Sequence, residues 1–158
     1  MAPIPPSFGR ALRLRLARWL AAVFAVGVLL GAPPAWARTV RIKEVDASKS
    51  PSPDVERRIE KTLTRLLKKA TRRAKWGKGD KIELSARVVK LIYEESDEVL
   101  RVSVTVVAKI AGGKGARSHI RLGGRPNKRQ DVEKDALKIV ADGLITRLSA
   151  IARGDKSD

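Results

Sequence analysis

Residues 82–110 read IELSARVVKLIYEESDEVLRVSVTVVAKI, two runs in which apolar and polar side chains alternate. Alternation with a period of two is the pattern of a β-strand with one buried face. The acidic segment 94–98 between the runs predicts the loop of a hairpin. Val88-Val89 shifts the apolar phase by one residue, which predicts a β-bulge. These residues therefore predict two long antiparallel strands.

Two shorter strands are predicted on either side of this hairpin. Residues 39–45 alternate apolar and charged side chains, which indicates a strand with one wet face. After the glycine-rich turn at 112–115, Ile120 and Leu122 are expected to face inward and Arg117, His119 and Arg121 outward. Residues 123–126, Gly-Gly-Arg-Pro, are expected to end the sheet.

A long helix is predicted after the first strand. Ser52 is expected to cap it and Pro53 to occupy its first position, and the glycines at 77 and 79 are expected to end it near Trp76. Its apolar residues follow one another at steps of three and four, which makes one stripe facing a core: Val55, Ile59, Leu63, Leu66, Leu67, Ala70 and Ala74.

A second helix is predicted from Gln130 to Ala152, with acids in its first turn and Arg153-Gly154 at its end. Gly143 within its apolar face predicts a close contact between this helix and the sheet. The apolar face consists of Val132, Ala136, Ile139, Val140, Gly143, Leu144, Leu148 and Ile151.

These elements predict an α+β fold in the order β-α-β-β-β-α. Two helices on one face of a mostly antiparallel sheet bury both apolar stripes. We expect residues 38–154 to form a single basic domain and residues 155–158 to be a disordered tail.

The N-terminal residues 1–37 have the pattern of a secretory signal peptide. Four arginines precede or flank an uncharged run from Trp19 to Gly31, and Ala35 and Ala37 supply an A-x-A cleavage site. An uncleaved membrane anchor would need about 20 apolar residues, and this run is shorter and is followed by Pro33-Pro34. Export to the periplasm or the extracellular space is therefore expected, by the general secretory route because no Arg-Arg pair precedes the apolar run. No transmembrane span is expected after cleavage.

The charge of the chain predicts an anionic partner. The net charge is +17, and removing residues 1–37 lowers it to +13 over 121 residues. Such a charge favours polyanions: an anionic membrane surface, lipopolysaccharide, an acidic protein or nucleic acid. Export argues against nucleic acid as the physiological ligand. A generic preference for basic residues on solvated faces is the alternative. The chain has no cysteine, which excludes both disulfides and a cysteine-linked lipid anchor.

Two surfaces are candidates for binding. The first is the basic face of the long helix, whose cations would bind phosphates by charge; its expected anion-binding residues are Arg65, Lys68, Lys69, Arg72, Arg73 and Lys75. The second is the outer face of the sheet, where cations surround apolar side chains; its expected residues are Arg87, Val89, Leu91, Arg101, Val107, Lys109, Arg117 and Arg121.

The residues that catalysis requires are few, so a non-catalytic protein without metal or cofactor is expected. His119 is the single histidine and is expected on a solvated strand face. The acidic residues 94–98 lack the spacing of a calcium loop and are expected to be a solvated tip. The turn Gly112-Gly113-Lys114-Gly115 lacks the phosphate-loop pattern, so a plain hairpin turn is expected.

The element order from Val40 to Ile151, behind a leader and with a cationic exterior, resembles the lipopolysaccharide-assembly lipoprotein family and related small envelope accessory proteins. The resemblance implies an envelope binding role, although the anchoring cysteine of that family is absent here and no functional residue is carried over. The hypothesis is thus an exported accessory protein that binds an anionic envelope component or a protein partner. The alternatives are a secreted hydrolase that uses the acidic loop with His119, and a structural module that self-associates through the open sheet.

Overall fold

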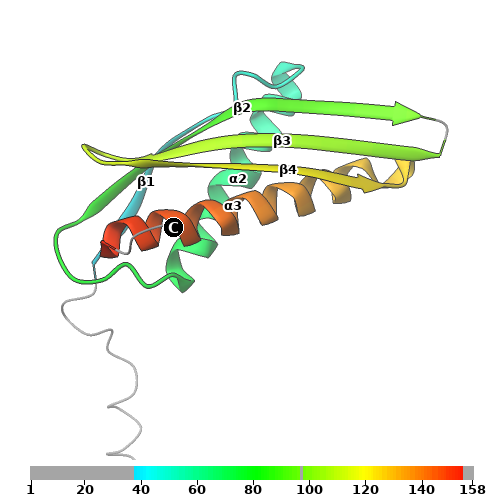
Figure 1. The fold of residues 1–158 in the computed structure, drawn as a ribbon. Helices are drawn as coiled ribbons and strands as arrows, with labels where there is room; N and C mark the ends of the chain where they lie inside the picture. Colours follow the sequence, from blue (N-terminus) through cyan, green and yellow to red (C-terminus); the bar gives the residue numbers. More distant parts are fainter. Residues whose placement is uncertain (1–37, 97, 155–158) are drawn as a thin grey trace, which may run out of the picture. The chain divides into compact units, whose positions relative to one another are not determined.

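The computed structural model describes residues 38–96 and 98–154. In chain order the elements are β1 (Val40–Asp46), α2 (Pro53–Arg73), β2 (Ile82–Ser96), β3 (Val99–Ile110), β4 (Gly115–Gly124), the short 3-10 helix η1 (Pro126–Lys128) and α3 (Arg129–Arg153). One four-stranded sheet lies against α2 and α3, which cover the same face (Figure 1). The predicted α+β fold is confirmed. The predictions for the leader, including Ala35 and Ala37, and for the tail 155–158 lie outside the described residues.

The strands lie side by side in the order β1-β2-β3-β4. β2, β3 and β4 pair antiparallel through tight connections, whereas β1 and β2 pair parallel. A parallel pair needs a long crossover, and α2 supplies it between β1 and β2. The sheet is therefore mixed, with one parallel pair at its β1 edge.

The predicted bulge is present, and it makes the predicted orientation of one residue, Leu91, wrong. The β2–β3 register shifts between Val88 and Lys90, so Val89 is the extra residue. Beyond the bulge the inward and outward positions exchange. Leu91, predicted on the outer face, consequently points into the core and is only 6% exposed.

The core lies between the helices and the inner sheet face. Ile59, Leu63 and Leu67 of α2 meet fully buried valines of the central strands, such as Val104. α3 buries two rows of residues, because Leu137, Ala141, Ile145 and Ser149 join the predicted stripe. Ile139, predicted in that stripe, is 47% exposed. Because the second row is also buried, the centre of the buried face of α3 lies on the side away from Ile139.

The helix ends follow local chemistry. Ser52 caps α2, where its hydroxyl accepts the amide of Val55 at 3.4 Å, and Gly154 closes α3 in the left-handed region. α2 ends at Arg73, earlier than predicted, and Trp76 folds back so that its Nε1 donates to the Thr71 carbonyl at 3.0 Å.

A Cβ on Gly143 would lie 3.3 Å from the Ser118 hydroxyl, which confirms the close contact of α3 with β4. No helix in the described part of the chain has the length and apolarity of a membrane span.

Candidate functional site

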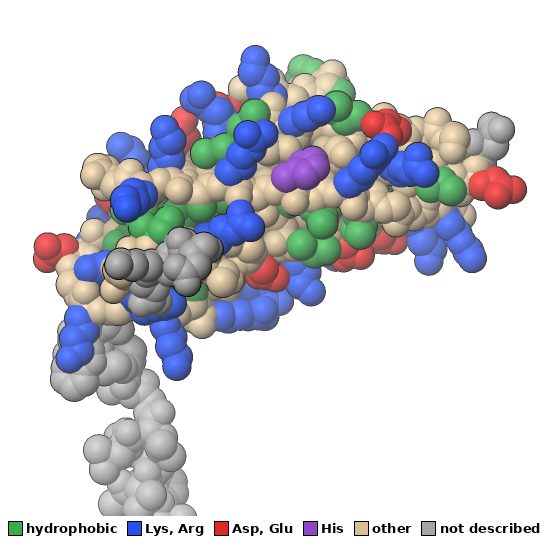
Figure 2. Space-filling model, in the orientation of Figure 1, with side chains coloured by type: hydrophobic (Ala, Val, Ile, Leu, Met, Phe, Trp, Pro, Cys, Tyr) green, Lys and Arg blue, Asp and Glu red, His purple; other side chains and the backbone are tan. Residues whose placement is uncertain are grey.

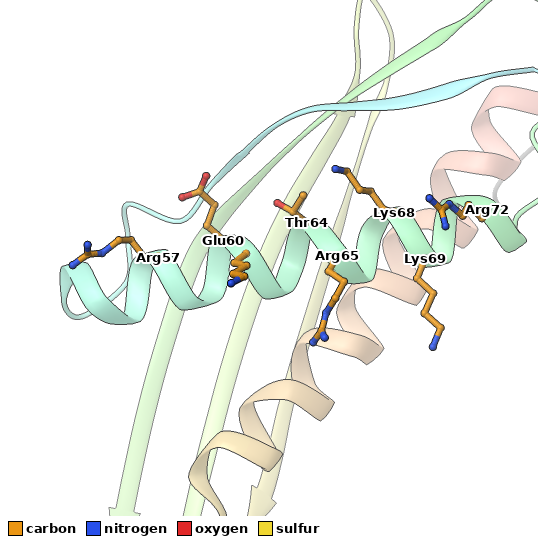
Figure 3. A pocket seen from close by; sticks show the side chains of 8 residues that line it. Arg57, Glu60, Thr64, Arg65, Lys68, Lys69 and Arg72 are labelled. Carbon is orange, nitrogen blue, oxygen red and sulfur yellow. The ribbon is translucent and has the colours of Figure 1, made fainter.

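The solvent side of α2 is almost entirely cationic. Its buried stripe recurs every three or four residues, so the remaining positions point away from the core (Figure 3). Arg57, Glu60, Lys61, Thr64, Arg65, Lys68, Lys69 and Arg72 surround a shallow hollow of about 840 Å³. All eight residues come from one helix. This hollow is therefore an open surface and has no second wall among the described residues.

The cations of this surface divide between the two sides of α2. In Figure 3, Arg65 and Lys69 extend toward α3, whereas Lys68 and Thr64 extend away from it. The predicted residues Arg65, Lys68, Lys69, Arg72 and Arg73 are all exposed on α2, and Lys75 is exposed beyond its end. None of these six side chains forms an ion pair within the described residues. Their charge is available to a ligand.

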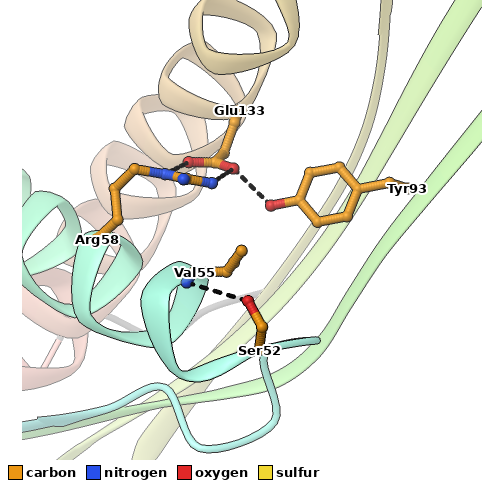
Figure 4. A network of polar contacts seen from close by, with 5 residues as sticks. All are labelled: Ser52, Val55, Arg58, Tyr93 and Glu133. Atoms are coloured by element: carbon orange, nitrogen blue, oxygen red, sulfur yellow. Dashed lines mark hydrogen bonds and ion pairs between the residues drawn. The ribbon is translucent and has the colours of Figure 1, made fainter.

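A polar network fixes α2 to α3 at the N-terminal ends of both helices. Arg58 Nε donates to Glu133 Oε1 at 3.0 Å, and Arg58 Nη2 donates to Glu133 Oε2 at 2.8 Å (Figure 4). The Tyr93 hydroxyl of β2 donates to the same Oε2. The Arg129 guanidinium lies 4.1 Å from the centre of the Tyr93 ring, a cation–π distance. These contacts hold two helices and a strand in one arrangement.

The network shifts the protonation of its members. Burial, followed by the hydrogen bond to Glu133, raises the pKa of Tyr93. The hydrogen bond to Glu133 is the main cause that raises the pKa of Arg58. At neutral pH these shifts keep Arg58 a guanidinium and Tyr93 a neutral phenol, which suits a structural joint. Glu133 was not predicted as buried, although it lies four residues before Leu137 in the second apolar row of α3.

The outer face of the sheet is the second surface, and no described element covers it (Figure 1). The predicted residues Arg87, Val89, Arg101, Lys109, Arg117 and Arg121 are exposed there, Val107 is half-buried, and Leu91 is the exception noted above. A hollow of about 370 Å³ between the strands is lined by Glu44, Asp46, Ser85, Ala86, Arg87, Val89, Val107 and Lys109. Carboxylates occupy part of this face: Asp46 binds Arg87 at 2.8 Å and Glu94 binds Arg121. Its positive charge is therefore partly neutralised.

His119 lies about halfway along the edge strand β4 on this outer face, with basic side chains around it (Figure 2). Its Nδ1 is 2.9 Å from the Thr105 hydroxyl, and Thr105 is 2% exposed beneath its neighbours. The acidic residues lie elsewhere. Glu94 is in register with Arg101 of β3, whereas His119 is in register with Thr105, four residues further along that strand. Four strand residues span about 13 Å. The histidine and carboxylates of the predicted hydrolase alternative are thus not brought together.

The glycine-rich segment is a plain hairpin turn, as predicted. It joins β3 to β4, with Gly112 in the left-handed region and the Ile110 amide donating to the Lys114 carbonyl at 3.2 Å. Within residues 38–96 and 98–154, no three histidine, cysteine or acidic side chains are grouped closely enough to hold a metal ion.

The comparisons with known proteins give distant structural similarity. No family model and no curated protein sequence matches the chain. A single-residue variant of the PelC dodecamer from Paraburkholderia phytofirmans matches with 18% identity and a TM-score of 0.46, over 74% of this chain and 95% of that one. A candidate lipoprotein from Caulobacter crescentus CB15 matches with 11% identity and a TM-score of 0.41, over 72% and 93%. A minor lipoprotein from Acinetobacter baumannii matches with 14% identity and a TM-score of 0.32, over 77% and 95%. At these values the similarities assign neither a site nor a function to this chain.

Proposed function

We propose that this protein is an exported, non-catalytic binding protein of the cell envelope whose ligand or partner is negatively charged. The observation that carries the proposal is the set of α2 cations with no carboxylate partner within the described residues: Arg65, Lys68, Lys69, Arg72 and Arg73. Surface cations that serve stability are usually interspersed with acids. On this helix the like charges repel each other at spacings of three and four residues, so an anionic ligand would relieve a cost that the free protein bears.

The cell-envelope location in this proposal is supported by the leader pattern of residues 1–37. An anionic membrane surface attracts basic side chains with about 1 kcal/mol each. The hollow on α2 is open and has one wall among the described residues, which favours an extended anionic surface over a small enclosed ligand.

Vesicle binding tests the proposal. The variant Lys68→Glu/Lys69→Glu/Arg72→Glu/Arg73→Glu should lose binding to vesicles that contain phosphatidylglycerol. Removing about 1 kcal/mol per cation lowers the affinity roughly a thousandfold, and the wild-type affinity should fall as salt is added.

A matched variant separates this site from charge in general. Lys49→Glu/Lys114→Glu/Arg125→Glu/Lys128→Glu changes the net charge equally at exposed positions outside α2. It should retain most of the vesicle binding. Equal losses in both variants would assign the effect to net charge, and salt-insensitive binding that neither variant weakens would remove the electrostatic basis of the proposal.

A further inference from the structure

The solvent side of the α2–α3 contact contains a groove that both helices line. It has a volume of about 430 Å³. The residues of its α2 wall are Arg65, Leu66, Lys69, Ala70 and Arg73, and those of its α3 wall are Lys134, Asp135, Lys138 and Asp142. Unlike the hollow on α2 alone, this groove has two walls, so a bound group would be contacted from both sides.

The cations form a row on each wall. Arg65, Lys69 and Arg73 are spaced four residues apart on α2, and Lys134 and Lys138 have the same spacing on α3. Four residues of helix rise about 6 Å. Successive cations of one row therefore lie about one helical turn apart and face the same groove.

The rows run in the same direction. Arg58 meets Glu133 at one end of the contact, and Arg73 shares the groove with Asp142 at the other. The Arg58–Glu133–Tyr93 network lies at the first of these ends and holds the two helices together there. The groove is thus preorganised by contacts that do not themselves bind a ligand.

The groove has an excess of positive charge that the protein does not neutralise. Five cations and two carboxylates line it, and none of these seven groups forms an ion pair with any described residue. Rows of like charges on adjacent helices repel each other. An anion between the rows would be attracted by both and would lower this repulsion.

The floor of the groove is apolar. Ala70 is buried and Leu66 is half-buried between the two rows. The exposed Ile139 lies four residues after Asp135 and three before Asp142, so helix geometry places it on the same side of α3 as the two acids. An acyl chain attached to an anionic headgroup would find apolar atoms both beneath and beside the cations.

We propose that the groove between α2 and α3 is a phosphate-binding site, in which Arg65, Lys69 and Arg73 face Lys134 and Lys138 across the bound group. Planar guanidinium groups and ammonium groups together are the usual ligands of phosphate. The inference rests on the proposed function, because it assigns the anionic ligand of the protein to one site. The phosphate belongs either to a lipid headgroup or to a soluble polyphosphate.

Two probes distinguish these sources. Inorganic tripolyphosphate, titrated calorimetrically into the purified protein, represents a soluble phosphate, and phosphatidylglycerol vesicles represent a headgroup. Lys134→Ala/Lys138→Ala removes the α3 wall, and Lys49→Ala/Lys114→Ala removes equal charge from exposed loops. Both pairs are exposed, so unfolding is not expected, and thermal melts check this.

The α3-wall variant should weaken at least one probe by tenfold or more, while the loop variant changes binding less than twofold. A loss confined to vesicles identifies a headgroup, and a loss confined to tripolyphosphate identifies a soluble ligand. Asp135→Asn/Asp142→Asn should strengthen the same probe, because it removes the two carboxylates that repel phosphate.

The groove inference is overturned if the α3-wall variant binds both probes like the wild-type protein, or if the loop variant loses as much. Vesicle binding that depends on the four α2 cations but not on Lys134 and Lys138 would leave the proposed function standing without the groove. Absence of binding to either probe by the wild-type protein would remove both proposals.

Discussion

Arg58 of α2 and Glu133 of α3, 75 residues apart in the chain, form a two-pronged ion pair in which the Glu133 side chain is only 4% exposed. Both guanidinium contacts are 3.0 Å or shorter, the geometry of a strong charge-assisted pair. Glu133 also accepts a hydrogen bond from the Tyr93 hydroxyl. One carboxylate therefore connects α2, α3 and β2, and any surface that both helices share depends on it.

Arg58→Met should destabilise the protein by about 2 kcal/mol. Methionine retains part of the apolar stem but leaves the Glu133 carboxylate buried without its counter-ion, which is the costly way to break a buried pair. The partly exposed Arg58 side chain places the effect below the usual range for fully buried pairs. Urea unfolding followed by circular dichroism measures the change.

The control for Arg58→Met is the same substitution at the neighbouring Arg57. Arg57 forms an ion pair with Asp54 at 2.8 Å, but the two side chains are 77% and 88% exposed. Exposed pairs contribute little, so Arg57→Met should change the free energy of unfolding by less than about 0.5 kcal/mol. Equal effects at the two positions would contradict the anchoring role of Glu133.

Tyr93 should titrate above the usual pKa of tyrosine. It is the only tyrosine in the chain, so the absorbance of phenolate at 295 nm reports its ionisation alone. Burial and the bond to Glu133 raise its pKa. In Glu133→Gln the carboxylate charge is lost, and the midpoint should move down toward the ordinary value of about 10.

The same shift has a consequence for stability. A tyrosine whose pKa is higher in the folded state contributes its full stabilisation below the unfolded pKa, and this is lost as pH rises from about 10 through the folded value. The free energy of unfolding should therefore fall with pH in that alkaline window, and fall less in Tyr93→Phe. A Tyr93 midpoint near 10 in the wild-type protein would contradict the network.

The arrangement of strands and helices was predictable because each element has a strong local pattern. Ser52-Pro53 set the start of α2, Gly154 set the end of α3, and Val88-Val89 revealed the bulge. The consequence of the bulge was missed at Leu91, since the phase of β2 beyond Val89 depends on pairing with β3. Ile139 was misplaced for a related reason: which row of α3 is buried depends on the sheet it meets.

The candidate site was only half predictable. The α2 cations stand out in the sequence, because ten basic residues occur between Arg57 and Lys78. Lys134 and Lys138 carry no such signal, since acids alternate with them along α3. Only the packing of α3 beside α2 brings them opposite Arg65 and Lys69.

Adjacent residues of β2 test the bulge. Leu91→Lys places a charged side chain in the core and should cost about 3 kcal/mol or more, from lost apolar burial and desolvation of the amine. Ile92 lies on the outer face, in register with Ser103, so Ile92→Lys should cost less than about 1 kcal/mol. Chemical denaturation of both variants gives the comparison. The reverse ranking would mean that the register continues without a bulge.

Lys68→Glu should stabilise the free protein while weakening its binding to anions. A glutamate at this position would lie four residues before Arg72 and three after Arg65, and each favourable pair contributes about 0.2–0.5 kcal/mol in place of a repulsion of similar size. The melting temperature should therefore rise at low salt, and the gain should shrink as salt screens the charges. Vesicle binding, measured on the same samples, should fall. If Lys68→Glu raises the melting temperature and weakens vesicle binding, then Lys68 does not serve stability and its role is anion binding. A variant that is less stable at low salt would show instead that Lys68 supports the fold.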